Sequence, residues 1–375
     1  MEVRMVNVKV LHLNAGAETG GGMVHILNVL KQMDRSKSIL GVFEDGLMKK
    51  KASELGIQVR LFKQSSRYDC LFLKKLAVFI DQESIEIIHT HGPRANLMGI
   101  FIKKIRPRLK WVTTLHSNPY DDFLGRGLKG KAFTWLHLQA LRRPDHYLAI
   151  SAPFRDLLVQ NGIAPSKITV IFNGIDFNEK ENSIPITRES LGLCKEDFVV
   201  SMIARLTPVK GHIDVLHAIH KLKGRYPQIK VLLAGDGFLE GQLKNKAAEL
   251  GIGKSLRFLG YRDDIGGLLA ISDIKLLASK SESFPLVLLE AARQMLPVIT
   301  TEVGGVKELI PNSDYGWVIP VGCVNSLANA LEEALHMKGN HILSAKGIRL
   351  YEHTSAHFTL ENCVKSITGA YGKFV

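Results

Sequence analysis

Two carboxylates flank an apolar, proline-containing run in the last third of the chain. Glu282 and Glu290 lie eight positions apart in the segment Ser279-Lys-Ser-Glu-Ser-Phe-Pro-Leu-Val-Leu-Leu-Glu290. Pro285 is tolerated at a helix start and Leu286 to Ala292 forms helix readily, so Glu282 is predicted just before a helix and Glu290 more than one turn inside it. Unpaired N–H groups at a helix start suit phosphate, and carboxylates suit hydroxyls. The ligand indicated here carries both a phosphate and a sugar.

A cationic pair follows an earlier predicted strand. Arg205 and Lys210 are five positions apart, and Pro208 and Gly211 shape the loop between that strand and the next helix. Arginine offers a planar fork of donors and lysine a compact charge, so together they can neutralise a departing diphosphate. An isolated pair with this spacing also describes two surface cations beside a helix start.

Three consecutive glycines, Gly20, Gly21 and Gly22, open the first predicted helix. Glycine lets the backbone approach a pyrophosphate closely, although a flexible turn needs the same residues. This run is not a Gly-x-Gly-x-x-Gly fingerprint, and the chain contains no Walker A sequence, which disfavours nicotinamide and ATP as ligands.

Taken together, these segments resemble the retaining glycosyltransferases of family 4, which have the GT-B fold of two Rossmann-like domains. The other segments that carry the resemblance are Thr19-Gly-Gly-Gly-Met23, Thr114-Leu-His116-Ser117, Asn173-Gly-Ile-Asp176, Ala204-Arg-Leu-Thr-Pro-Val-Lys-Gly211 and Ala234-Gly-Asp-Gly237. Ala204 replaces the glycine that the family usually has. The resemblance covers nearly the whole chain, and its specificity comes from the combination.

The resemblance implies a set of site residues. Those implied in catalysis are His116, Arg205, Lys210 and Glu282. Those implied in donor binding are Gly20, Gly21, Gly22, Arg205, Lys210, Gly235, Arg262, Glu282, Phe284, Pro285, Leu286 and Glu290, and those on the acceptor side are His91 and Asn118. Glu290 is expected to bind the ribose hydroxyls and Glu282 the donor sugar, with a buried structural carboxylate as the alternative for Glu290.

No metal site is expected. His89 and His91 alternate on one predicted strand and are expected to face opposite sides, which argues against a shared metal. The chain also lacks Asp-x-Asp, the metal–nucleotide motif of the other large glycosyltransferase fold. Charge on the leaving diphosphate is therefore expected to be balanced by protein cations, with the nucleotide sugar as substrate and no cofactor.

The chain shows no signs of export or of a disulfide framework. Cys70, Cys194, Cys323 and Cys363 are scattered with no Cys-x-x-Cys spacing, so incidental thiols are expected. No apolar run is long enough to cross a bilayer, and Met1 to Leu13 lacks a secretory apolar core. A cytoplasmic protein is expected from these features.

The positive charge is concentrated in the first half. Residues 1–180 hold 27 Lys/Arg and 16 Asp/Glu, a net of +11, against 22 and 20, a net of +2, in residues 181–375. Between Ile100 and Arg143, basic residues are interleaved with apolar ones. This mixture fits peripheral attachment to an anionic inner membrane face, and it fits equally well soluble helices with solvated lysines. No nucleic-acid module accompanies the charge, so nucleic acid is not an expected partner.

Short apolar segments alternate with helical ones in both halves, which predicts an α/β fold of two doubly wound domains facing across a cleft that holds the ligand. The predicted strands are Val6–Leu13, Ile39–Phe43, Ile87–Thr90, Trp111–Leu115, His146–Ile150 and Ile168–Ile171, then Phe198–Ile203, Lys230–Ala234, Leu256–Leu259, Ile274–Ala278, Val298–Thr300 and Gly316–Ile319. The polar stretch Phe177–Ser190 separates an acceptor-side domain, 1–180, from a nucleotide-sugar-binding domain, 181–355. The resemblance implies that a C-terminal helix within 356–375 joins the first domain.

The sequence therefore predicts transfer of a hexose or N-acetylhexosamine, with retention, from a nucleotide-diphosphate sugar to an acceptor hydroxyl. UDP is the expected nucleotide, and synthesis of cell-surface polysaccharide or glycolipid is the expected setting. A nucleotide-sugar epimerase of GT-B architecture and a catalytically silent sugar-nucleotide-binding protein remain the alternatives. The acceptor, the sugar and the linkage are left open.

Overall fold

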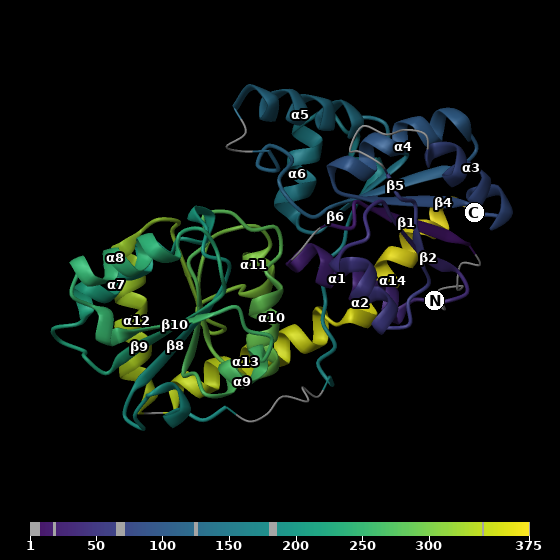
Figure 1. Ribbon diagram of the computed structural model, residues 1–375. Coiled ribbons are helices and arrows are strands. Elements are labelled where there is room, and N and C mark those ends of the chain that lie inside the picture. Colours follow the sequence, from purple (N-terminus) through teal and green to yellow (C-terminus); the bar gives the residue numbers. More distant parts are fainter. Residues whose placement is uncertain are drawn as a thin grey trace. The chain divides into compact units, whose positions relative to one another are not determined.

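The computed structural model describes residues 8–17, 20–64, 72–123, 127–179, 186–339 and 341–374. The chain divides into two compact units, Met1–Gly174 with Leu360–Val375, and Ile175–Thr359 (Figure 1). The boundaries expected from the sequence, 180 and 355, lie a few residues from these. Thr19, Cys70, Arg126 and the middle of the Phe177–Ser190 linker lie outside the described residues.

The first unit is built on a seven-stranded parallel sheet in the order β3-β2-β1-β4-β5-β6-β7. Its strands are β1 Val10–Asn14, β2 Ser38–Val42, β3 Val59–Leu61, β4 Ile87–His91, β5 Lys110–Leu115, β6 His146–Ala149 and β7 Ile168–Val170. Its helices are α1 Gly21–Gln32, α2 Leu47–Glu54, α3 Phe72–Gln82, α4 Pro93–Ile105, α5 Gly127–Ala140, α6 Ala152–Gln160 and α14 Leu360–Tyr371. Strand β3 was not predicted from the sequence because it is a three-residue edge strand whose side chains are all at least partly exposed.

The second unit is built on a six-stranded parallel sheet in the order β10-β9-β8-β11-β12-β13. Its strands are β8 Phe198–Ile203, β9 Ile229–Ala234, β10 Leu256–Gly260, β11 Ile274–Leu277, β12 Val298–Thr301 and β13 Trp317–Ile319. Its helices are α7 His212–Leu222, α8 Glu240–Glu249, α9 Ile265–Ala270, α10 Leu286–Arg293, α11 Val306–Leu309, α12 Val324–Lys338 and α13 Ile342–His357.

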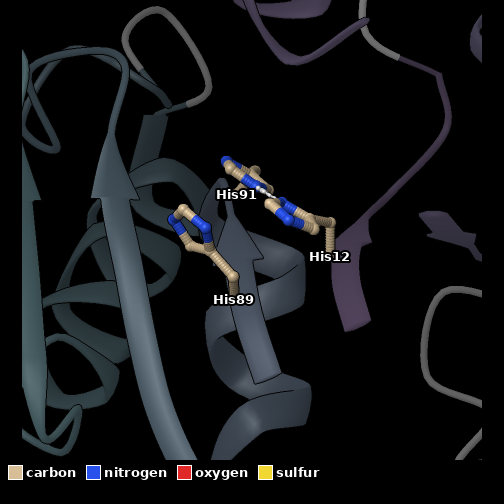
Figure 2. Close-up of side chains that lie close together, drawn as sticks. All are labelled: His12, His89 and His91. Carbon is tan, nitrogen blue, oxygen red and sulfur yellow. Dashed lines mark hydrogen bonds between the residues drawn. The ribbon is translucent and has the colours of Figure 1, made fainter. Parts of the chain in front are cut away.

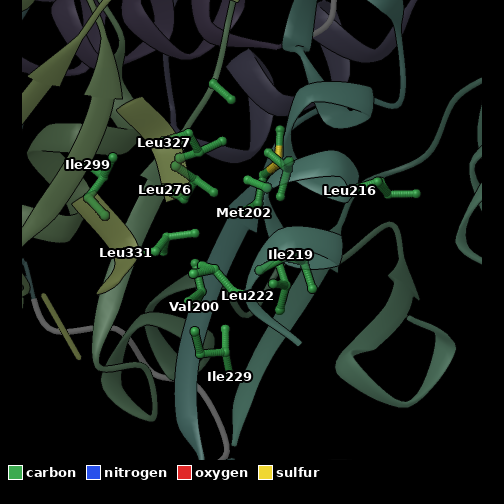
Figure 3. Close-up of a cluster of buried hydrophobic side chains, with 14 of the residues drawn as sticks. Val200, Met202, Leu216, Ile219, Leu222, Ile229, Leu276, Ile299, Leu327 and Leu331 are labelled. Atoms are coloured by element: carbon green, nitrogen blue, oxygen red, sulfur yellow. The ribbon is translucent and has the colours of Figure 1, made fainter. Parts of the chain in front are cut away.

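The core of the second unit lies between its sheet and the helices α7 and α12. Val200 and Met202 of β8 lie near Ile219 of α7, and Leu216 of α7 and Leu331 of α12 belong to the same cluster (Figure 3). These side chains are at most 1% exposed, and burying each contributes roughly 1.5–3 kcal/mol. Strands covered on both faces must be apolar along their whole length, which is why they were recognisable in the sequence.

In each sheet the strand order reverses once, between β1 and β4 in the first unit and between β8 and β11 in the second. Ligands of open parallel sheets bind outside the carboxyl ends of the strands at such a reversal. Within the described ranges, no helix is both long and apolar enough to cross a membrane.

Candidate active site

In the second unit, the loops that follow β8 and β11 meet at the strand-order reversal. The backbone N–H of Lys280 donates to the carbonyl of Val209 over 2.7 Å. The hydroxyl of Thr301, at the end of β12, donates to the carbonyl of Ser279 over 2.5 Å. The loops that carry the predicted cations and the predicted carboxylate are thus joined into one surface.

Glycines make this close contact between loops possible. Gly211 has φ +70°, and a Cβ there would lie 2.0 Å from the carbonyl oxygen of Ala278. Gly235 has φ +141°, and a Cβ there would lie 2.1 Å from the carbonyl oxygen of Ala204. Any other residue at either position would force the backbone apart, so Gly235 acts by holding the loops together.

Lys210 and Glu282 form the centre of this surface. The Lys210 Nζ lies 2.6 Å from Glu282 Oε1, and the Ser279 hydroxyl donates to the same oxygen over 2.6 Å. Both charged side chains are largely buried, with 18% and 15% of their area exposed. The sequence had given these residues separate contacts to the donor, whereas the structure brings them into one charged pair.

The other two predicted cations differ in their surroundings. Arg205, which follows β8, is exposed, and no partner for its side chain lies among the residues that the structure describes. Arg262 instead forms a two-pronged ion pair with Asp264, with Nε 2.7 Å from Oδ1, and this raises the pKa of the guanidinium. Arg205 is therefore the cation available to an incoming anion.

The predicted helix exists as α10, with Glu282 in the preceding loop and Glu290 in its second turn. Pro285 occupies the position before the helix rather than its first turn. Phe284 and Leu286 are buried, and the ring of Phe284 lies 5.6 Å from that of Phe358. Their side chains pack inside the unit, so a contact from these two residues to a ligand requires their backbone groups.

Lys275 lies beneath this surface and was not predicted from the sequence as a site residue. It is fully buried on β11, and its Nζ donates to the carbonyls of Leu276 at 3.0 Å and Ser201 at 3.4 Å. Burial lowers the pKa of this lysine to about 7, with Glu290 and Glu282 partly opposing that shift. The only signal in the sequence was a single lysine within an apolar strand.

In the first unit, α1 begins at the glycine run. Gly20 precedes the helix with φ +91°, and a Cβ on Gly20 or Gly21 would meet no atom within 4 Å. The first turn contains no acidic residue. This helix start is open, uncharged and suited to an anion.

The expectation that His89 and His91 face opposite sides is wrong. Their rings lie on the same side of β4 with centroids 4.2 Å apart, because residues two apart on a strand share a face (Figure 2). His12 of β1 lies beside them, and the three rings can place one nitrogen each within 4.8 Å of one another.

His116 directly follows β5 and contacts this group. Its Nε2 lies 2.9 Å from Nδ1 of His91, and burial lowers the pKa of His116 well below its usual value. Asn118 lies two residues further, where its Oδ1 accepts the backbone N–H of Tyr120 over 3.1 Å. The structure therefore brings His91 and His116 together, while Asn118 shapes the turn beside them.

A groove opens next to this turn. Its volume is about 340 Å³, and it is lined by Leu115, Pro119, Tyr120, Trp135, Leu138, Gln139, Leu141, Arg142, Leu157, Leu158, Asn161 and Ile163. Trp135 is 60% exposed at its rim. Aliphatic and aromatic side chains line the groove together with the polar side chains of Gln139, Asn161 and Arg142.

Two family models match the chain one after the other. Glycosyltransferase Family 4 matches residues 19–179, and Glycosyl transferases group 1 matches residues 183–348. Each match corresponds to one of the two α/β units.

Known proteins resemble the chain over most of its length. A UDP-Gal:alpha-D-GlcNAc-diphosphoundecaprenol alpha-1,3-galactosyltransferase of Escherichia coli is 28% identical over 74% of this chain and 73% of that enzyme. An N-acetyl-alpha-D-glucosaminyl L-malate synthase of Bacillus anthracis is 29% identical over 81% of this chain and 79% of that enzyme. Among solved structures, Anabaena Alr3699/HepE in complex with UDP superimposes with a TM-score of 0.84 at 24% identity, covering 98% of this chain and 100% of that one. With both units matched by models of the same class, the chain belongs to the family 4 glycosyltransferases and has their GT-B fold.

Proposed function

We propose that this protein is a retaining glycosyltransferase that moves a hexose or N-acetylhexosamine from a UDP-sugar to an acceptor hydroxyl. The observation that carries the proposal is the Lys210–Glu282 pair at the strand-order reversal of the second unit, with Arg205 exposed on the loop that also bears Lys210. The pair provides a buried cation and a carboxylate within 2.6 Å of each other, which suits a ligand with a diphosphate joined to a sugar.

In the proposed reaction, the bond from the sugar to the diphosphate breaks and negative charge develops on the departing oxygen. Lys210 and Arg205 stabilise that charge, and fixed cations at such a point typically contribute several kcal/mol to lowering the barrier. Glu282 binds the donor sugar, Glu290 binds the ribose, and His116 contacts the sugar that is transferred. The charge balance is proposed to need no divalent ion.

UDP as the nucleotide is supported by the names of similar proteins. The E. coli relative is named for UDP-Gal, and the Anabaena structure contains UDP. The E. coli relative is also named for a diphosphoundecaprenol acceptor, which supports a lipid-linked acceptor here. We propose that the groove beside Trp135 and Arg142 receives the lipid part of that acceptor.

A peripheral membrane contact is part of the same proposal. We assign this contact to helix α5 rather than to the basic residues at the end of α4. Lys103 is paired with Asp145, and Arg106 with Asp81, so both cations are engaged within the first unit. Helix α5 instead exposes Leu128, Lys129, Lys131, Trp135 and Leu136, which we name the α5 patch. Exposed aromatic and aliphatic groups beside lysines suit an anionic bilayer surface.

The deciding experiment is a panel of nucleotide sugars incubated with the protein, with and without a lipid-linked acceptor. A UDP-sugar should raise the thermal midpoint, because a ligand that binds only the folded state stabilises it. With acceptor, NMR of the product should show the anomeric configuration of the donor. Product formed without acceptor, as a changed sugar on UDP, would identify an epimerase instead. Donor binding with no turnover on any acceptor would favour the silent binding protein.

A further inference from the structure

Three histidines form a hydrogen-bonded string in the first unit: His12 of β1, His91 of β4 and His116, which directly follows β5. The Nδ1 of His12 lies 3.1 Å from Nε2 of His91, and Nδ1 of His91 lies 2.9 Å from Nε2 of His116. His12 and His91 are 1% and 3% exposed. Figure 2 shows the first of these contacts, and the planes of the two rings are within 7° of parallel.

The cluster is arranged for hydrogen bonding rather than for a metal ion. The ring of His89 uses both nitrogens, with Nδ1 2.6 Å from the hydroxyl of Tyr371 and Nε2 2.7 Å from that of Thr114. Both nitrogens of His91 are also engaged. A metal-binding imidazole must offer a free lone pair. Among these rings, only Nε2 of His12 lies buried without a partner, and one ligand does not make a site.

All rings of the string are neutral at physiological pH. Burial lowers the pKa of His12 to about 3 and places those of His91 and His116 well below their usual value. A neutral imidazole carries one hydrogen, so one nitrogen donates and the other accepts. A ring that accepts a hydrogen bond at one nitrogen must therefore donate from the other. Only two arrangements of the hydrogens satisfy both contacts.

The two arrangements differ at the ends of the string. In the first, Nδ1 of His12 donates to His91, Nδ1 of His91 donates to His116, and Nδ1 of His116 carries a hydrogen. In the second every direction is reversed, so Nε2 of His12 carries a hydrogen and Nδ1 of His116 offers a lone pair. Nε2 of His12 is buried with no partner in the described structure, so the second arrangement leaves a buried N–H donor without an acceptor. Buried donors without acceptors are rarer in proteins than acceptors left without donors.

We propose that His12 and His91 are positioning residues that hold His116 as the tautomer with its hydrogen on Nδ1. His116 then presents a donor at the partly exposed end of the string, where its Nδ1 has no partner among the described residues. A donor there binds the hydroxyl and phosphate oxygens of a nucleotide sugar and cannot act as a general base. The relevance to catalysis rests on the proposed function, whereas the tautomer itself does not.

The test uses the full-length protein labelled with ¹⁵N in its histidine rings. Protonated and unprotonated ring nitrogens are well separated in NMR spectra, and the His116 signals are identified by their loss in His116→Gln. The expected result is a neutral His116 with hydrogen on Nδ1 alone. An unprotonated Nδ1 of His116 in the unmodified protein overturns the proposal.

Three variants then test whether His12 sets the direction of the hydrogen bonds along the string and so the tautomer of His116. His12→Phe keeps a ring but removes the donor, so His116 should populate both tautomers and transfer should fall about tenfold, the equivalent of one hydrogen bond. His12→Asn places an amide N–H where Nδ1 was and should restore both the single tautomer and most of the rate. His146→Phe is the matched control, because His146 is a buried histidine near the start of β6 in the same sheet. This variant should change neither the tautomer of His116 nor the rate of transfer.

The positioning role of His12 and the role of His116 in the proposed function can be refuted separately. If His12→Phe leaves the His116 spectrum unchanged, the positioning role is wrong while the proposed function stands. If His116→Gln transfers sugar at the normal rate, the role of His116 in the proposed function is wrong while the tautomer assignment stands.

Discussion

Lys210 and Glu282 neutralise each other in the second unit, with 2.6 Å between Nζ and Oε1. Lys210 is on the loop after β8, and Glu282 is on the loop after β11, more than seventy residues later. Ser279 also donates to Oε1 of Glu282, so the carboxylate has a second partner besides Lys210. The pair thus places a largely buried cation next to a carboxylate at the strand-order reversal.

Replacing Lys210 by alanine should lower transfer by about 10²-fold or more, because a preorganised cation for the leaving group is lost. Steady-state kinetics with the UDP-sugar identified in the panel measure the effect. Lys230→Ala is the matched control, since Lys230 is equally buried at 17% exposure and paired with Asp197 near the start of the same sheet. Comparable losses in the two variants would mean that the effect is structural.

Transfer should persist in excess chelator. The proposed charge balance uses Lys210 and Arg205, and the sequence has no Asp-x-Asp to hold a metal beside the nucleotide. Product formation is measured after treatment with EDTA, followed by magnesium or manganese. Activity that disappears with EDTA and returns with either ion would refute the metal-independent reaction.

The protein should lose stability as the pH falls below about 6.5. Burial lowers the pKa of His12 to about 3 and those of His25 and His212 to about 4. Between these values and about 6.5 the unfolded chain binds more protons than the folded one, so the free energy of unfolding decreases with falling pH, by roughly 1.4 kcal/mol per unit for each group. Denaturant midpoints at pH 7.5, 6 and 5 measure this decrease.

His212 offers a clean test of that acid sensitivity, because it is 2% exposed and neither ring nitrogen has a hydrogen-bond partner among the described residues. His212→Phe should reduce the loss of stability between pH 6.5 and 4. His220→Gln, an exposed position on the same helix, serves as the control and should not. Equal acid sensitivity of both variants would contradict the assignment.

Lys275 should make the free energy of unfolding depend on pH above about pH 7. Its pKa is about 7 in the folded protein, whereas an unfolded lysine titrates near 10.5. Between those values only the unfolded chain holds the proton, so the free energy of unfolding rises with pH, and below pH 7 the full cost of the buried charge remains. Lys275→Met should remove the rise and be more stable than the parent at pH 6. A parent profile that is flat from pH 7 to 10 would disprove a buried lysine of this kind.

The α5 patch should attach the protein to anionic vesicles. Each lysine near such a surface contributes about 1 kcal/mol, and salt screens the attraction over roughly 8–10 Å. Flotation should therefore require anionic lipid, weaken as salt rises, and disappear in Lys129→Glu/Lys131→Glu and in Trp135→Ser. Lys110→Glu/Lys167→Glu changes the charge of the same unit equally at other exposed cations and should float normally. Flotation that is equal with neutral lipid, or absent with both, would leave these lysines as solvated surface residues.

The sequence by itself determined the two parallel sheets and the family. Strands such as Phe198–Ile203 are buried on both faces, so they must be continuous apolar runs, and those runs are visible without coordinates. Glu282 before α10 and Glu290 within it were also predictable, because Pro285 and the following leucines specify a helix start locally. The same local patterns placed Arg205 and Lys210 after a strand.

Only the tertiary structure decided which of these groups meet. The Lys210–Glu282 pair depends on β8 and β11 lying side by side although β9 and β10 separate them in the chain, and no local pattern encodes that neighbourhood. The string of His12, His91 and His116 likewise requires β1, β4 and β5 to be adjacent, and the hydrogen on each ring is set by its partner rather than by its own sequence context. In the sequence Lys275 was a single lysine within an apolar strand, and it is its burial in the folded unit that chiefly lowers its pKa. Spacing along the chain identifies chemical groups, whereas their protonation and pairing are properties of the folded environment.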